Sequence, residues 1–163
     1  MELSGNAWNL NRSPEEAENA MIQLFAQIYA STIEAFVERY GQSVLDLARE
    51  AFISSMVEPI KKGEAPFSNR DLNTFIEWLI SGICVGHRGE FVEKTDQSVK
   101  FCFTSCPYAT IFRQIGKEEI GRFFCDADGP LINAFNDKIQ FERHHTLMDG
   151  DDHCDHHYYT AEK

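Results

Sequence analysis

The chain has 163 residues, 43% of them hydrophobic, and a formal net charge of −11. This length and hydrophobic content suffice for one domain with a substantial core, and they exclude a chain that is disordered throughout. The acidic balance argues against nucleic acids and anionic membranes as partners, because both attract basic proteins. We therefore expect a single domain spanning residues 1–163.

The beginning of the chain, MELSGN at residues 1–6, has neither the basic nor the apolar region of a signal peptide. Without an uninterrupted apolar run of membrane-spanning length, we also expect no transmembrane helix. The five cysteines form no regular framework, which favours reduced thiols in a cytoplasmic protein over a secreted disulfide scaffold.

Three helices are predicted in the helical half, residues 13–86. Ser13 and Pro14 begin the first with an N-cap serine, a proline at the first helical position and acids in the first turn. Apolar residues then recur at helical spacing until Tyr40-Gly41. A second helix is expected at about 43–60 and a third from 69–71 through Ile80.

The hydrophobic period changes in the second half, residues 87–160. Residues 89–103 alternate as two strands around a turn near 96–97, and residues 139–143 and 156–159 flank an Asp149-Gly150 hairpin signal. Between these pairs, Pro107 begins a helical segment that Gly116 interrupts. The order predicts an α+β fold, with the N-terminal helices on one side of a four-stranded antiparallel sheet built from two hairpins.

Three cysteines lie beside groups that can activate or orient a thiolate. Cys106 precedes Pro107 and is expected at a helix N-cap, where backbone amides and the helix dipole would lower its pKa below the usual value of about 8.5. Cys125 is followed by two acids, and Cys154 lies between a histidine and an aspartate. Each is also compatible with simple packing, which is the role expected for Cys84 and Cys102.

The register of the second hairpin decides which side chains accompany Cys154. A two-residue turn at Asp149-Gly150 would pair His145 with Cys154 and place their β-carbons about 5 Å apart. A slip of one residue would exchange the two faces of the strands. In the expected register the core-facing residues are Ile139, Phe141, Arg143, His145, Cys154, His156 and Tyr158. His144, Asp155 and His157 would then face the other way.

Several motifs appear in order between residues 105 and 159. They are CPY at 106–108, IGRFFCD at 120–126 followed by Asp128, AFNDKI at 134–139, FER at 141–143, TL at 146–147 and GDDHCD at 150–155. With these motifs the chain resembles the L-2-amino-thiazoline-4-carboxylic acid hydrolase family. The founding activity of that family opens a thiazoline ring by hydrolysis to give N-carbamoyl-cysteine.

The resemblance implies a site and a chemistry. The expected catalytic residues are Cys106, Cys125, Cys154 and Asp155, to which His145 is added by the hairpin register. The expected substrate-binding residues are Tyr108, Asp128, Arg143 and Thr146. The chain departs from the family where His156 and His157 follow Cys154-Asp155, since the family tends to continue Cys-Asp-Phe.

Two chemical mechanisms remain open at this point. In the covalent one, the Cys106 thiolate attacks the ring carbon, Asp155 or a histidine transfers protons, and no cofactor is required. In the other, a divalent metal, with zinc as the best match, binds Cys106, Cys125, Cys154 and His145 and activates water. No Cys-x-x-Cys pair occurs in the chain, which argues against a structural zinc module. For His144, His153, His156 and His157, a solvated edge without a ligand is the alternative.

The sequence therefore predicts a small-molecule hydrolase, acting on a C–N or C–S bond, with neither nucleic acid nor membrane as a partner. A homo-oligomer remains an option. The expected layout is also similar to domains of the 4-vinyl-reductase and TRAPP type, so a non-catalytic domain that binds a small ligand or metal is the alternative. Both predict that Cys106, Cys125 and Cys154 converge in one pocket.

Overall fold

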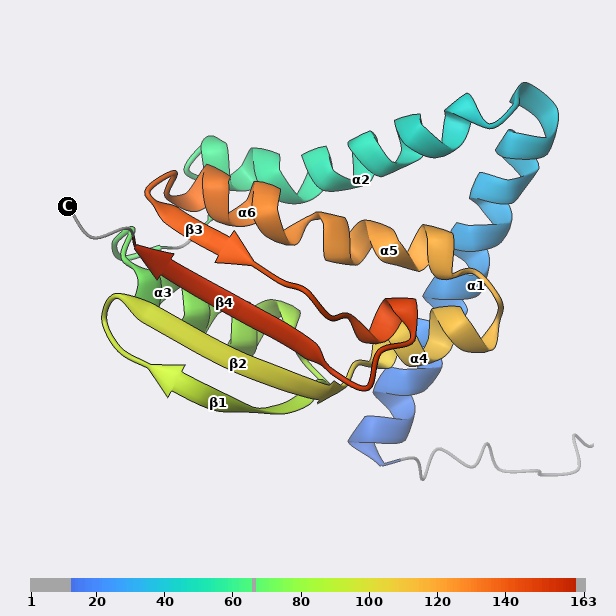
Figure 1. Ribbon diagram of the computed structural model, residues 1–163. Coiled ribbons are helices and arrows are strands. Elements are labelled where there is room, and N and C mark those ends of the chain that lie inside the picture. Colours follow the sequence, from blue (N-terminus) through green and yellow to red (C-terminus); the bar gives the residue numbers. More distant parts are fainter. Residues whose placement is uncertain (1–12, 66, 161–163) are drawn as a thin grey trace, which may run out of the picture.

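The computed structural model describes residues 13–65 and 67–160 and shows the predicted α+β fold (Figure 1). The helices are α1 (Pro14–Tyr40), α2 (Ser43–Lys61), α3 (Leu72–Trp78), α4 (Pro107–Gln114), α5 (Glu118–Asp126) and α6 (Asp128–Phe135). A π-helical turn, η1 (Leu79–Ile83), continues α3, and η2 (Leu147–Asp149) is a short 3-10 turn. The strands are β1 (Arg88–Lys94), β2 (Ser98–Ser105), β3 (Ile139–Glu142) and β4 (Cys154–Thr160).

Helix α1 begins and ends where the sequence predicts. The Ser13 hydroxyl accepts a hydrogen bond from the Glu16 N–H at 3.1 Å, and the Glu16 carboxylate accepts one from the Ser13 N–H at 2.7 Å. This capping box satisfies two backbone donors that the first helical turn leaves free. At the other end Gly41 has a φ of +93°, a conformation that favours glycine and stops the helix.

The four strands form one antiparallel sheet in the order β1-β2-β4-β3. Ile139 pairs with Thr160 and Glu142 with His157, which is the predicted register of the second pair of strands. The core-facing placement of Cys154, His156 and Tyr158 is confirmed, since all three are buried while their neighbours Asp155 and His157 are only half-buried.

The predicted two-residue turn at Asp149-Gly150 is wrong. Pairing of β3 ends at Glu142, and a longer connection containing η2 leads to Cys154. Local bonds shape this connection: Thr146 accepts from the Met148 N–H at 3.2 Å, and Asp151 accepts from the Thr146 N–H at 2.7 Å. Such side-chain bonds to the backbone compete with the strand ladder.

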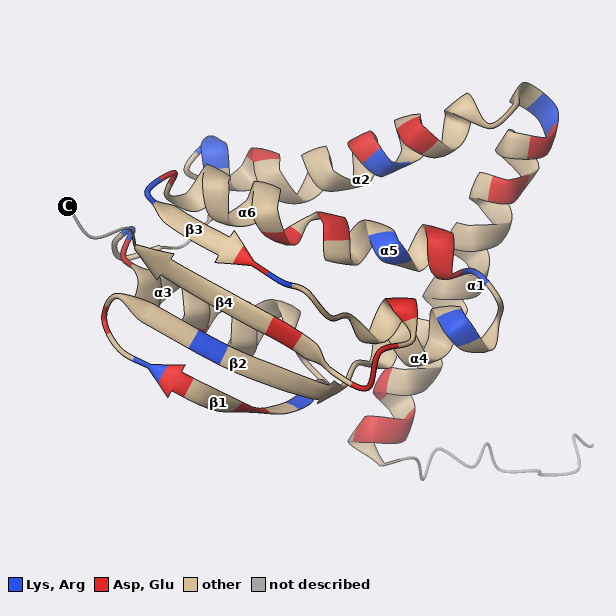
Figure 2. Ribbon diagram, viewed as in Figure 1, with Lys and Arg blue, Asp and Glu red and all other residues tan. Residues whose placement is uncertain are grey.

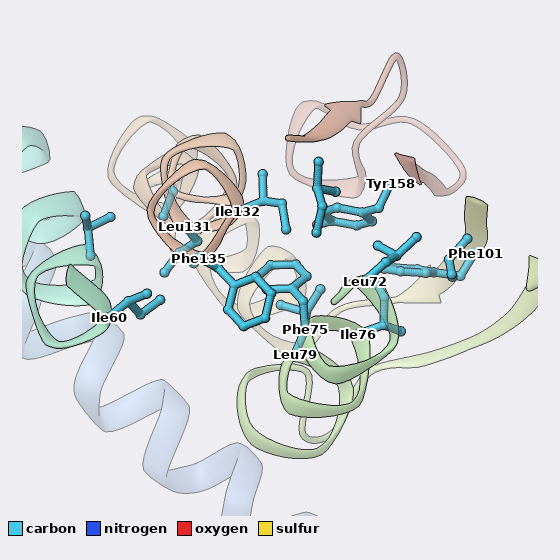
Figure 3. Close-up of a cluster of buried hydrophobic side chains, with 14 of the residues drawn as sticks. Ile60, Leu72, Phe75, Ile76, Leu79, Phe101, Leu131, Ile132, Phe135 and Tyr158 are labelled. Carbon is cyan, nitrogen blue, oxygen red and sulfur yellow. The ribbon is translucent and has the colours of Figure 1, made fainter. Parts of the chain in front are cut away.

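Two hydrophobic clusters hold the helices to the sheet. The first lies between the sheet and helices α2, α3 and α6, and its buried side chains include Phe75, Leu131, Phe135 and Tyr158 (Figure 3). The second joins α1 to α4 and α5 through small and aromatic residues, among them Ala26, Ala30, Phe112 and Phe123. The candidate site lies where the two clusters meet.

Length and composition alone would allow α1 to cross a membrane, because its most apolar window has a mean hydropathy of 1.3. Only 22% of that window is buried inside the protein. A core helix can pass the same test, so this finding is weak evidence for a membrane span. The low burial of this window means that α1 leaves apolar surface exposed.

Candidate functional site: a thiol-lined cavity

Cys106, Cys125 and Cys154 line one cavity of about 70 Å³, so their predicted convergence is confirmed. They come from three segments: the junction of β2 with α4, the last turn of α5, and the start of β4. A fourth thiol, Cys84, lines the same cavity. Aliphatic and aromatic side chains, including Leu79, Phe103 and Phe124, form most of the remaining wall.

Cys106 occupies the predicted N-cap of α4. Its Sγ accepts a hydrogen bond from the Ala109 N–H at 3.3 Å, and Pro107 takes the first helical position. The expected low pKa of this thiol is wrong. Burial raises the pKa of Cys106 to about 11, and the opposing bonds from the Ala109 and Tyr108 amides do not compensate. The N-cap therefore orients the thiol without ionising it at neutral pH.

Thr146 connects the other two predicted cysteines. Its Oγ1 lies 3.7 Å from the Sγ of Cys125 and 3.7 Å from the Sγ of Cys154. Cys154 Sγ also accepts from the Leu147 N–H at 3.2 Å. Burial raises the pKa of Cys125 to about 12 and also raises the pKa of Cys154. Thr146 was expected to bind substrate. In the structure its hydroxyl contacts two of the thiols.

Sequence analysis assigned Cys84 to the core. The π-helical turn η1 ends at Ile83, and Cys84 then contributes to the cavity wall. Burial raises the pKa of this thiol to about 12, and Cys106 and Cys154 are close enough to contribute. The one available signal was the pair Cys84 and His87 on either side of Gly86, at the junction between a helix and a strand.

A buried ion pair forms the charged part of the wall. Arg143 donates to the Asp128 carboxylate through Nη1 and to the Cys125 carbonyl through Nη2 at 3.2 Å. The two side chains are only 16% and 15% exposed. Burial raises the pKa of Asp128 to about 6, although Arg143 opposes the shift. Asp128 and Arg143, both predicted to bind substrate, therefore line the cavity as a pair that is ionised at neutral pH.

Two histidines line the cavity in their neutral form. Burial lowers the pKa of His156 to about 3, and its ring packs 5.0 Å from Phe101 and 5.5 Å from Phe141 between ring centroids. Burial also lowers the pKa of His87, whose Nδ1 lies 3.4 Å from the Val85 carbonyl. If that contact is the donor side of the ring, Nε2 is left as an acceptor.

Tyr108, the fourth residue predicted to bind substrate, contributes an aromatic wall. Its ring stacks on Phe124 with centroids 4.5 Å apart, and the His87 ring lies 6.1 Å away. All three residues line the cavity. A flat ring of a ligand would find stacking surfaces here.

His145 and Asp155, two of the five predicted catalytic residues, do not line the cavity. The Asp155 carboxylate accepts from the backbone N–H groups of His144 at 2.9 Å and His145 at 2.5 Å. These bonds anchor the connection after β3, and the His145 side chain remains 53% exposed beside Asp151 and His153. The expected pairing of His145 with Cys154 fails because the ladder ends at Glu142.

The predicted metal-binding set is likewise not assembled, since His145 lies outside the cavity. In the part of the chain that the structure describes, no three His, Cys, Asp or Glu side chains form a group that could hold a metal ion. Four thiols line the cavity. Their arrangement resembles a polar lining more than a coordination sphere.

The fold and the cavity together define a small α+β protein with a thiol-lined cavity. Residues 21–158 match the model of the L-2-amino-thiazoline-4-carboxylic acid hydrolase family, and the chain belongs to that family. The match covers most of the chain, so it extends well beyond the resemblance seen in residues 105–159. No curated protein matches the sequence.

Among solved structures, a similar one is the crystal structure of a trafficking protein particle complex subunit 3 from Naegleria fowleri covalently bound to palmitic acid. The TM-score is 0.52, the identity is 12%, and the match covers 88% of this chain and 96% of that chain. At this identity the likeness shows the fold alone.

Proposed function

We propose that this protein hydrolyses a small cyclic thiazoline- or amidine-like substrate inside the thiol-lined cavity. The family to which the chain belongs supports a hydrolase. The observation that carries the proposal is the combination, in one cavity, of four thiols with neutral imidazoles and a buried ion pair. The cavity volume of about 70 Å³ restricts the ligand to a small molecule.

Arg143 is the proposed binding group for a substrate carboxylate. Among the described residues that line the cavity, it is the one with a permanent positive charge. A guanidinium has five N–H donors in a planar fork, so Arg143 can bind a second carboxylate while it keeps its bond to Asp128. The Tyr108 and Phe124 rings would then hold the flat heterocycle against the thiols.

Cys106 is the proposed nucleophile. Because burial keeps its thiol protonated at neutral pH, attack requires a base, and His87 and ionised Asp128 are the cavity groups able to accept the proton. The thiolate adds to the ring carbon between nitrogen and sulfur, and the bond from that carbon to ring sulfur breaks. The released sulfur takes the proton and becomes the product thiol.

Water completes the reaction. It adds to the same carbon of the enzyme-bound isothiourea, and the bond to the Cys106 sulfur breaks as the urea carbonyl forms. The backbone N–H groups of Ala109 and Tyr108 stabilise the departing thiolate. One water molecule is consumed, and Cys106 is regenerated by protonation. In this scheme no cofactor is needed.

The direct test is hydrolysis of L-2-amino-thiazoline-4-carboxylic acid by purified protein. The released thiol is measured with a chromogenic disulfide and N-carbamoyl-cysteine by mass spectrometry. We expect both products from the wild type and from Cys102→Ser, whose residue lies outside the cavity, and neither from Cys106→Ser. Activity that is lost with a chelator and retained in Cys106→Ser would replace the covalent scheme with the metal-based one.

A non-catalytic ligand-binding domain is the second candidate, favoured by the largely apolar wall of the cavity. The similar trafficking particle subunit is described as covalently bound to palmitic acid, and in this chain a buried thiol could carry an acyl group. An intact mass that includes an acyl group removable by hydroxylamine would support this candidate. Saturable binding of thiazolines without product would support simple ligand binding.

A further inference from the structure

Helix α1 leaves a row of large apolar side chains in water. Met21, Leu24 and Ile28 are 66%, 52% and 60% exposed, although they lie in the middle of a long helix. Phe25 and Phe36 extend the row on one flank and are 44% and 50% exposed. The opposite face of the helix, with Ala26, Ala30 and Ile33, is the one that packs on the protein.

The row follows the spacing of a helix–helix seam. Ala17, Met21, Leu24, Ile28, Ser31 and Ala35 are separated alternately by four and three residues. This heptad pattern keeps one stripe directed at a neighbouring helix along its whole length. The spacing of the stripe is therefore that of a helix that packs along a second helix.

We propose that this stripe is the interface of a homodimer, in which the α1 helices of two copies pack antiparallel. With a two-fold axis beside residue 26, Leu24 of each copy packs against Ile28 of the other, Met21 against Ser31, and Ala17 against Ala35. The small residues at the ends of the stripe leave room for the larger ones. An isologous contact of this kind needs one self-complementary patch, which the stripe supplies.

The area of the stripe is adequate for such a contact. If the three large side chains of the stripe and the flanking Phe25 and Phe36 each show on the order of 100 Å², they present roughly 500 Å² of apolar surface. This is at the upper end for a patch on a typical monomer. The small residues between them bring the buried area towards the roughly 800 Å² per partner of a standard interface.

The distribution of charge favours a second copy over a membrane surface. Residues 19–33 contain no charged side chain, so two negatively charged molecules meet through a neutral strip. The ends of α1 carry five glutamates and one arginine, Arg39, whereas helices that lie on membranes are rich in lysine and arginine. Antiparallel packing also opposes the helix dipoles.

The interface would share a wall with the cavity. Phe25, on the flank of the stripe, contacts Phe124 edge-on with ring centroids 6.2 Å apart, and Phe124 lines the cavity. Dimerisation would therefore fix Phe25 against a residue that borders the site. The proposal itself does not depend on the reaction that the cavity performs.

Sedimentation velocity of the full chain at micromolar concentration tests the proposal. We expect a mass twice the 18.7 kDa of the chain for the wild type and a monomer for Ile28→Glu. Leu47→Glu is the matched control, since Leu47 is 64% exposed on α2 and lies outside the stripe; it should remain dimeric. Because Ile28 is exposed, circular dichroism should show that Ile28→Glu is folded.

Oxidative cross-linking tests the register. Residue 27 lies next to the two-fold axis. Gln27→Cys should therefore cross-link, on mild oxidation, to the same residue of the other copy. Glu38→Cys, near the C-terminal end of α1 and far from the axis, and the wild type with its native thiols should not. A monomeric wild type, or an Ile28→Glu variant as dimeric as the wild type, would overturn the proposal. Flotation of a monomeric wild type with zwitterionic lipid vesicles would assign the stripe to a membrane instead.

Discussion

The segment from Arg143 to His157 supplies two regions with the same residue types and opposite surroundings. Cys154 and His156 enter the cavity, where burial keeps the thiol protonated and the imidazole neutral. In the histidine corner, defined as His144, His145 and His153, each imidazole lies beside a carboxylate near the surface. Histidines and acids crowded in sequence were the obvious signal, yet the enclosed region has the better geometry for chemistry.

The difference lies in solvent. Exposed ion pairs contribute little to stability because water and salt screen them, whereas a buried pair becomes costly as soon as one partner is lost. Figure 2 shows acidic residues spread along the helices, strands and loops. The comparison therefore predicts large effects for substitutions in the cavity and small ones in the corner.

The largest expected effect is on activity. Cys106→Ser should lower kcat/KM at least about a thousandfold, because the hydroxyl is a far weaker nucleophile at the same position. Serine is a good N-cap, so α4 should still form and the melting temperature should change little. Cys102→Ser, in the strand β2 that precedes Cys106 but outside the cavity, should retain full activity. Residual activity within tenfold of the wild type would remove Cys106 from the role of nucleophile.

Local signals made most of the fold predictable. The Ser13-Pro14 start, the Gly41 end of α1 and the Cys106-Pro107 cap are set by neighbouring residues, and the structure places them as expected. The β3–β4 register was also correct, because alternating burial of Ile139, Phe141 and Tyr158 fixes it independently of the turn. The turn itself depended on hydrogen bonds of Thr146 and Asp151 that no periodicity reveals.

The site was predictable only in part, for a different reason. Convergence of Cys106, Cys125 and Cys154 followed from which face each element buries. Ionisation did not, because the helix N-cap lowers the pKa of Cys106 while desolvation raises it by more. The contribution of Cys84 depends on the π-helical turn η1, a local geometry without a sequence rule.

The ion pairs of the two environments give the next test. Asp128→Asn leaves the Arg143 guanidinium buried without its carboxylate, so the free energy of unfolding should fall by about 3–5 kcal/mol in urea denaturation. Asp149→Asn breaks the exposed pair with Arg122 and should cost about 1 kcal/mol or less. Equal losses in the two variants would show that water reaches Asp128 as freely as it reaches the surface.

A smaller effect is expected in the dependence of stability on pH. The pKa of His156 is lowered to about 3 by burial, while the unfolded chain binds the proton near the ordinary value of about 6.5. The stability that this site contributes is therefore present above pH 6.5 and is lost as the pH falls from 6.5 towards 3.

His156→Gln removes this titration. Between pH 6.5 and 5 the wild type should lose about 2 kcal/mol relative to the variant, measured as the difference between their urea denaturation curves at each pH. His153→Gln, in the exposed corner, should not gain stability relative to the wild type as the pH falls over this range. A wild-type advantage that stays constant with pH would mean that folded His156 is already accessible to protons.

The smallest effect is expected for His145, which the hairpin register had placed in the site. Its side chain is 53% exposed, and its backbone N–H donates to the Asp155 carboxylate. His145→Ala should therefore change kcat/KM less than about twofold and stability by less than about 0.5 kcal/mol, whereas His87→Ala in the cavity should lower activity strongly. A tenfold loss of activity in His145→Ala, with unchanged stability, would mean that residues 143–153 close over the cavity when substrate binds. In that event the corner would become part of the site, and the contrast between the two regions would hold only for the free protein.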